Sequence, residues 1–135
     1  MSRSKFSVSP YSKRIEKPWG YELILAPASL PFTGKILHIK QGARLSLQYH
    51  EQKQETLCLL KGKAKLYLED SSGVLQEFSM EPLKGYLVVP FQKHRMEGIT
   101  DCDLLEASTA EKGNTVRLED DYDRSTETEE DRKLR

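Results

Sequence analysis

Short runs of alternating polar and apolar residues, separated by turn residues, constrain the fold of this chain most. In the clearest run, residues 63–69, Ala64, Leu66 and Leu68 alternate with polar or amphipathic neighbours. Such alternation predicts a strand with one face in the core and the other in water. The chain shows almost no helix-length periodicity. The expected strands are 21–25, 35–39, 45–50, 55–60, 64–69, 75–78, 86–89, 95–97 and 104–108. About nine short strands in about 90 residues are typical of a β-sandwich or small barrel, so the predicted class is all-β.

The length of 135 residues fits one domain. Turn-forming residues at 26–31, 40–42, 61–63 and 70–73 separate the strands. The two ends fall outside this pattern: we expect a flexible segment at 1–14, the domain at 15–124, and a polar tail at 125–135 that is disordered or a frayed helix.

Composition narrows the class of protein. The 21 basic and 21 acidic residues cancel, so no overall field would attract nucleic acid. No apolar run approaches the ~20 residues that span a bilayer, and residues 1–12 lack the apolar core of a signal peptide. Cys58 and Cys102 do not form a Cys-x-x-Cys pair, so both are expected to be reduced. We therefore expect a cytoplasmic protein that binds neither nucleic acid nor membrane.

Potential metal-binding side chains recur at fixed offsets between two glycines. The stretch runs Gly42, five residues, Gln48, one residue, His50, four residues, Glu55, six residues and Gly62. In a strand, Gln48 and His50 point to the same side, about 7 Å apart. A turn then brings the strand of Glu55 alongside. The glycines suit tight turns at both ends.

A later histidine, His94, could complete this set. Amide oxygen, imidazole nitrogen and carboxylate form a mixed donor set that suits a divalent ion, Zn²⁺ first, with Mn²⁺, Fe²⁺ or Ni²⁺ as alternatives. Such a site leaves positions open for substrate. Each histidine also has a plainer interpretation, because a lone strand histidine is commonly structural. His38, which no partner frames, is interpreted as a surface or core histidine.

These residues resemble the motifs of a cupin, a small jelly-roll barrel also called a double-stranded β-helix. Gln48 replaces the first histidine of the first motif, and Leu-Ser-Leu-Gln-Tyr-His resembles mannose-6-phosphate isomerases. The likeness is greatest to the cupin domain at the end of bifunctional mannose-1-phosphate guanylyltransferase/isomerases. The second motif is short, and Asp123 stands where the family has glycine. The other matching segments are Gly85…Pro90…His94-Arg95, Lys17-Pro-Trp-Gly-Tyr-Glu22 and Val116–Arg124.

The resemblance implies aldose/ketose isomerisation of a sugar phosphate, such as mannose 6-phosphate to fructose 6-phosphate. One divalent ion on Gln48, His50, Glu55 and His94 would stabilise an enediolate. The proton transfer needs a base. Glu106 is a candidate, because burial in its apolar strand would raise its pKa, and Lys53 is a second; a surface-facing Glu106 is the alternative.

Substrate binding requires cations for the phosphate and a surface for the sugar. Arg95 beside His94, and Lys35, are the candidates for the phosphate, together with Lys53. Each could instead be a solvated surface charge. Trp19 could cover the barrel or stack on the sugar, although packing in the core is the preferred interpretation.

The sequence also predicts a partner subunit and leaves alternative functions open. Leu45, Leu47 and Tyr49 lie on the face of their strand opposite Gln48 and His50, so a second subunit is expected to cover them in a homodimer. The main alternative function is a non-catalytic cupin module that binds a sugar or nucleotide-sugar. Gln48 disfavours Fe(II)-dependent dioxygenation, and a metal-free nucleotide-sugar epimerase would leave the ligand set without a purpose.

Overall fold

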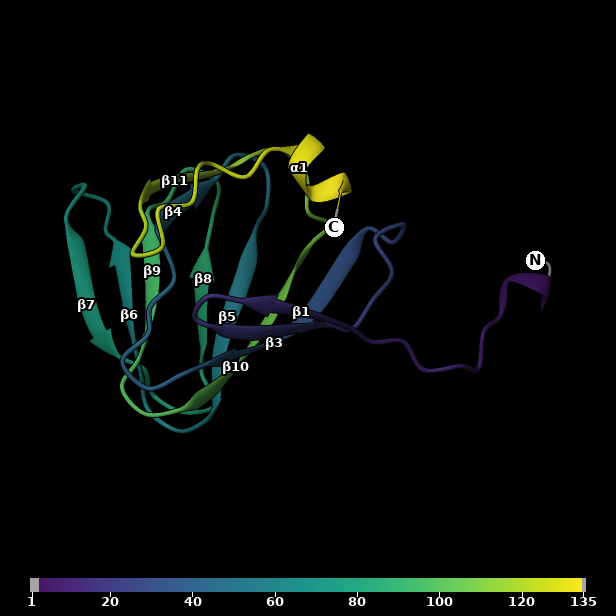
Figure 1. Cartoon of the computed structure of the whole chain (residues 1–135), viewed down its shortest axis with the longest axis horizontal. Helices are drawn as coiled ribbons and strands as arrows, with labels where there is room; N and C mark the ends of the chain where they lie inside the picture. The colour runs from purple at the N-terminus through teal and green to yellow at the C-terminus, as the bar shows by residue number, and fades with distance from the viewer. Residues whose placement is uncertain (1–2, 135) are drawn as a thin grey trace.

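Two antiparallel sheets face each other in the computed structural model, which describes residues 3–134 (Figure 1). In order across the first sheet lie β1 (Lys13–Lys17), β2 (Gly20–Ile24), β3 (Phe32–Ile39), β10 (Cys102–Thr109), β5 (Glu55–Lys61) and β8 (Gly85–Val88). In the second lie β11 (Thr115–Glu119), β4 (Leu47–His50), β9 (His94–Gly98), β6 (Ala64–Glu69) and β7 (Leu75–Ser79). The all-β class is confirmed.

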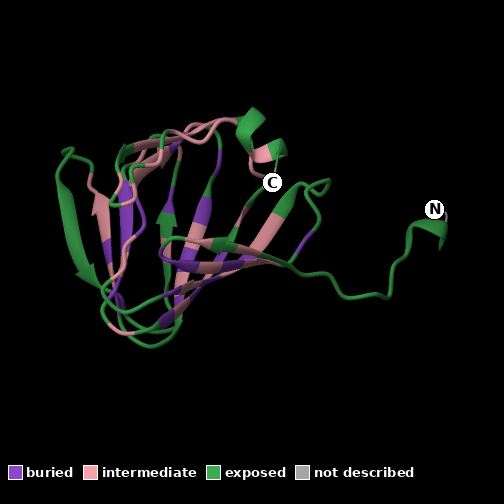
Figure 2. Ribbon diagram, in the orientation of Figure 1, coloured by how far each residue is buried: buried purple, intermediate pink, exposed green. Residues whose placement is uncertain are grey.

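The core lies between the sheets, where alternate residues of each strand point inward. Leu37 and Leu104 of one sheet and Leu66 and Met96 of the other are almost fully buried. Figure 2 shows the buried residues on the strands that face one another, whereas β7 and the N-terminal segment are exposed. In β6, Ala64 and Leu66 are buried and Leu68 packs against the core, as their alternation predicted.

Two strands were missing from the sequence-based expectation. β1, Lys-Arg-Ile-Glu-Lys, is an edge strand that pairs only with β2, and its charges suit an edge that must not attract another chain. It begins at Lys13, inside the segment expected to be flexible. β11 pairs with β4 through a register shift between Arg117 and Glu119.

The strand expected at 45–50 begins only at Leu47. Leu45 is buried in the core and lines the same cavity as Gln48 and His50. The expectation that Leu45 lies on the opposite face was therefore wrong: the chain is irregular at 45–46, so alternation does not extend back to it. Leu47 and Tyr49 remain partly exposed.

The C-terminal residues fold back over one end of the barrel (Figure 1). Thr115 and Glu127 exchange backbone hydrogen bonds of 2.8 and 2.9 Å, and the short helix α1 (Glu129–Lys133) is capped by Thr128. Of the two alternatives expected for this tail, disorder or a frayed helix, the structure has a short helix, and ion pairs of Glu127 with Arg117 and of Arg132 with Glu111 hold the segment to the barrel. The helical segments of residues 3–134, η1 (Arg3–Lys5) and α1, are far too short to cross a membrane.

Candidate functional site

His50, Glu55 and His94 converge inside one end of the barrel. His50 ends β4, Glu55 begins β5 after the turn that joins the two sheets, and His94 begins β9. The β4–β9 register places Gln48 opposite His94. The Nε2 atoms of His50 and His94 lie 3.4 and 3.3 Å from Glu55 Oε1. One ligand atom from each residue falls within 4.8 Å of the others.

Hydrogen bonds on the far side of each ring orient these imidazoles. His94 Nδ1 lies 3.0 Å from Gln92 O; since a carbonyl only accepts, Nδ1 donates, and this orients Nε2 toward Glu55. His50 Nδ1 lies 2.9 Å from Thr115 Oγ1. Burial lowers the pKa of His50 to about 4 despite Glu55 nearby, so its ring is neutral at neutral pH.

The nitrogen and oxygen atoms at the centre of this group are buried without hydrogen bonds to the described part of the chain. Both Nε2 atoms and both Glu55 carboxylate oxygens are buried and form no hydrogen bond within residues 3–134, although Glu55 Oε2 has an ion pair with Lys53 Nζ at 3.3 Å. Burying such atoms without partners is costly. A cation can bridge two imidazole nitrogens and a carboxylate oxygen that face one another, and this N₂O donor set fits a divalent metal ion. The three side chains thus form a potential metal site.

Gln48 lies next to this group, in the lining of the same cavity. Its Oε1 atom accepts a 2.6 Å hydrogen bond from Ser46 Oγ, which orients the amide. The structure therefore brings together His50, Glu55 and His94, with Gln48 beside them. The ligand roles of all four remain predictions.

Lys53 and Glu106 form a buried pair beside Glu55. Lys53 Nζ lies 3.1 Å from Glu106 Oε2 and 3.3 Å from Glu55 Oε2. Burial alone would lower the pKa of Lys53, but Glu106, Glu55 and Glu111 raise it well above its usual value, so the ammonium stays charged. Burial and the Glu55 charge raise the pKa of Glu106 to about 7, against the opposing effect of Lys53. Glu106 faces the interior, which excludes the surface alternative.

Lys35 extends the buried charges toward the end of the barrel. It pairs with Glu111 and lies 3.8 Å from Glu22 Oε2. Burial opposes its charge, but Glu106, Glu111 and Glu22 together raise the pKa of Lys35. Lys35 is thus neither solvated nor directed at bulk water, and its partners hold it in the wall of the cavity.

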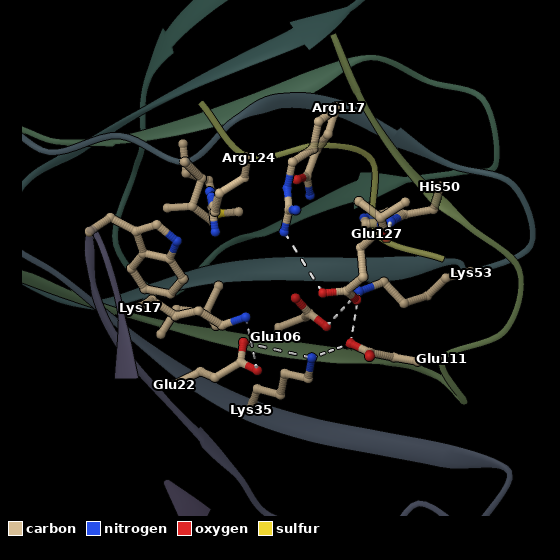
Figure 3. A pocket seen from close by; sticks show the side chains of 16 residues that line it. Lys17, Glu22, Lys35, His50, Lys53, Glu106, Glu111, Arg117, Arg124 and Glu127 are labelled. Carbon is tan, nitrogen blue, oxygen red and sulfur yellow. Dashed lines mark hydrogen bonds and ion pairs between the residues drawn. The ribbon is translucent and has the colours of Figure 1, made fainter. Parts of the chain in front are cut away.

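A cavity of about 60 Å³ opens over these residues (Figure 3). Trp19, Lys35, Lys53 and Glu106 line it with Gln48 and His50. Trp19 is buried in the core while it lines the cavity, so packing and ligand contact are compatible. Arg95 is not among the described lining residues. Its Nε donates to Leu45 O at 2.8 Å and its Nη2 lies 3.5 Å from Asp121, outside this group.

Six further charged residues line the cavity without having been assigned a site role from the sequence. Lys17, Glu22, Arg117 and Arg124 lie in segments that resemble family motifs, so the motifs could have indicated them. Glu111 and Glu127 carry no such signal, because they lie in a charged stretch that resembles a solvated end. The six are Lys17, Glu22, Glu111, Arg117, Arg124 and Glu127.

Solved structures of similar fold are cupins of low sequence identity. KdgF from Halomonas sp. is 16% identical, with a TM-score of 0.61 over 74% of this chain and 87% of that one. An RmlC-like cupin from Shewanella frigidimarina is 12% identical, with a TM-score of 0.60 over 74% and 85%. The capsular polysaccharide assembling protein CapF from Staphylococcus aureus is 14% identical, with a TM-score of 0.61 over 95% of this chain and 34% of that one.

The cupin jelly roll is confirmed by these likenesses. No curated protein matches the sequence significantly. The family described as the mannose-6-phosphate isomerase C-terminal domain, however, matches residues 6–123, most of the chain. The motifs that the sequence shares with this family include Gln48, His50, Glu55 and His94, of which Gln48 and His50 line the cavity. The chain belongs to the mannose-6-phosphate isomerase C-terminal family of cupins.

Proposed function

We propose that this protein is a metal-dependent isomerase of sugar phosphates, of the mannose 6-phosphate/fructose 6-phosphate type. The observation that carries the proposal is the group His50, Glu55 and His94, whose buried donor atoms lack hydrogen bonds. Family membership supports the substrate class. A divalent ion, Zn²⁺ first among the candidates, would act as a Lewis acid on substrate oxygens when bound by these residues and Gln48.

The other cavity residues supply what a shift of a carbonyl between two carbons requires. A base must remove a proton from one carbon and return it to the next. Glu106 suits this role, because its raised pKa of about 7 lets it accept and release a proton near neutral pH. Lys53, 3.1 Å away and charged, would hold the Glu106 carboxylate in place and stabilise negative charge on the substrate. Trp19 and Lys35 line the same cavity and would contact the sugar.

A coupled isomerase assay on the metal-reconstituted protein tests this proposal. Mannose 6-phosphate should be converted, and Glu55→Gln and His94→Ala should each lose most bound metal and activity, since each removes one of three donors. Metal content is measured by mass spectrometry of the purified variants. The matched control is His38→Ala, because His38 pairs with Asp103 on the outside of the barrel and should leave metal and turnover unchanged.

Two results would contradict the proposal. Stoichiometric metal without turnover of any hexose phosphate would contradict the proposed isomerase activity. It would support the alternative, a module that binds a sugar or nucleotide-sugar. Full activity in metal-stripped protein would instead contradict the proposed metal dependence and the proposed role of His50, Glu55 and His94 as metal ligands.

A further inference from the structure

A carboxylate of the chain itself occupies the arginine-rich side of the cavity. Glu127 Oε1 lies 3.1 Å from Arg132 Nε, and Glu127 Oε2 lies 3.8 Å from Arg117 Nη2. The three side chains are only 13–17% exposed. Glu127 belongs to residues 125–134, here named the C-terminal strap. The two guanidinium groups thus hold a carboxylate, whose charge and oxygen atoms resemble those of a phosphate group.

Two arginines present their guanidinium groups on this side of the cavity. Arg117 contacts the strap a second time, because its Nη1 donates to Ser125 O at 2.7 Å. Arg124 uses Nε and Nη2 to bind Asp120, and these bonds engage only part of its five N–H donors. In Figure 3, Arg117 and Arg124 point into the cavity from the same side, and Arg124 lies toward the end away from His50 and Lys53. Planar guanidinium forks match the oxygens of a phosphate group.

We propose that Arg117 and Arg124 form a subsite for the phosphate group of a phosphate monoester, and that Glu127 is its built-in competitor. The phosphate dianion takes the place of the Glu127 carboxylate on Arg117, and the strap moves away with Glu127. That the ligand is a sugar phosphate rests on the proposed function. The anion subsite itself requires neither metal nor turnover.

The size of the cavity supports displacement of the strap. About 60 Å³ holds a few water molecules, at roughly 10–15 Å³ for each by this measure, whereas a hexose phosphate is several times larger. A hexose phosphate would therefore have to project from the open mouth of the cavity or displace part of its lining. The strap is held by polar contacts and not by burial, because α1 has no buried residue. Backbone bonds join Glu127 to Thr115, side-chain hydrogen bonds join the strap to Gly113 and Arg117, and ion pairs join Glu127 to Arg117 and Arg132 to Glu111. A dianion competes directly with those ion pairs.

Isothermal titration of inorganic phosphate into the metal-stripped full chain tests the subsite. Glu127→Gln should tighten phosphate binding by about fivefold or more, at the low end of the coupling between interacting sites. Because a misfolded variant would lose affinity, this gain cannot arise from damage. Glu130→Gln is the matched control: Glu130 is on the same strap, 82% exposed, and pairs with Lys133, so phosphate binding should not change.

Removing the arginine tests the other half of the pair. Arg117→Gln should weaken phosphate binding, and the double variant Arg117→Gln/Glu127→Gln should lose the gain seen in Glu127→Gln alone, since the two residues act on each other. Mannose 6-phosphate should compete with inorganic phosphate, and mannose should not. Thermal unfolding of each variant verifies that the fold is retained.

The outcomes separate this inference from the proposed isomerase activity. Unchanged affinity in Glu127→Gln, an equal gain in Glu130→Gln, or no detectable phosphate binding in any variant would overturn the subsite, even if the protein isomerises mannose 6-phosphate. The expected affinity pattern without turnover would support the subsite and contradict the isomerase activity.

Discussion

Glu106 shows at the scale of one residue how neighbours adapt a common side chain to proton transfer. It points inward from β10 and meets Lys53 Nζ at 3.1 Å. Burial and the charge of Glu55 make ionisation costly, and Lys53 and Lys35 only partly offset that cost, so its pKa rises to about 7. A carboxylate with this pKa exists in both protonation states at neutral pH, as a group that shuttles a proton must.

The pH dependence of the isomerase activity should therefore reflect the ionisation of Glu106. A base works only when deprotonated, so kcat/KM should fall as the pH drops below about 7 and level off above it. Glu106→Gln should lower kcat by about 100-fold or more and keep its metal, because Glu106 lies outside the His50, Glu55 and His94 group.

The control for this measurement is Glu77→Gln, on the outer strand β7, where Glu77 pairs with Lys65. It should retain both activity and the pH profile. A Glu106→Gln enzyme with unchanged kcat, or a wild-type profile that is flat between pH 5 and 8, would contradict the assignment of Glu106 as the base.

Single residues also show where prediction from sequence succeeded and where it could not. The spacing of His50 and Glu55 implied that they meet, because strand alternation and one short turn determine their positions. The arginine–carboxylate contacts of Glu127 depend on how the chain folds back after β11, and a charged C-terminal stretch carries no local signal of that path. Arg95 was a candidate only if the chain turns after His94, because adjacent strand residues face opposite sides; β9 continues through it, and Arg95 contacts Leu45 and Asp121 instead.

At the scale of elements, interior strands were easier to predict than edges. β6 and β10 bury alternate apolar residues, so their sequences contain the period of a strand. β1 lies at an edge with few buried side chains, and its charged sequence resembles a flexible end. Backbone pairing with β2 stabilises β1. The periodicity of apolar residues in the sequence carries no information about such pairing.

The turns between strands yield a prediction that the sequence motif cannot make. Gly42 and Gly62 begin and end the motif and have similar left-handed backbones, with φ of 78° and 82°. A Cβ at Gly42 would meet nothing within 4 Å, whereas one at Gly62 would lie 2.3 Å from Asp101 O and 2.9 Å from Cys102 Cα. The backbone conformation penalises alanine at both positions, but only Gly62 also faces a steric clash.

We expect Gly42→Ala to lower the free energy of unfolding by about 1–2 kcal/mol, the cost of a left-handed alanine. Gly62→Ala should lower it by about 3 kcal/mol or more, because forced overlap in a packed region adds about 1–3 kcal/mol. Urea denaturation followed by circular dichroism measures both variants. Equal losses would mean that the contact around Gly62 relaxes without cost.

At the scale of the whole molecule, apolar side chains remain exposed on the outside of the barrel. Leu87 of β8 is 69% exposed, and Val89 and Phe91 just after it are 51% and 62% exposed. Phe91 adopts a left-handed backbone with φ of 68°, which is costly for a bulky residue. Its ring lies against Tyr49, with ring centroids 5.7 Å apart. Phe91 therefore adjoins the partly exposed Tyr49 side of β4, where the sequence led us to expect a partner subunit, and Leu87 and Val89 precede it in the chain.

The exposed residues Leu87, Val89 and Phe91 form a specific surface on which the predicted homodimer can be tested. Leu87→Ser and Phe91→Ser should each shift the sedimenting species from dimer to the 15.5 kDa monomer, because each removes apolar surface that association would bury. Val8→Ser is the control, since Val8 is equally apolar and fully exposed but lies on the N-terminal segment, away from the barrel. A wild-type protein that sediments as a monomer at every concentration would contradict the dimer. A dimer that both variants retain would instead exclude this patch, and the partner would then have to use another face of the barrel.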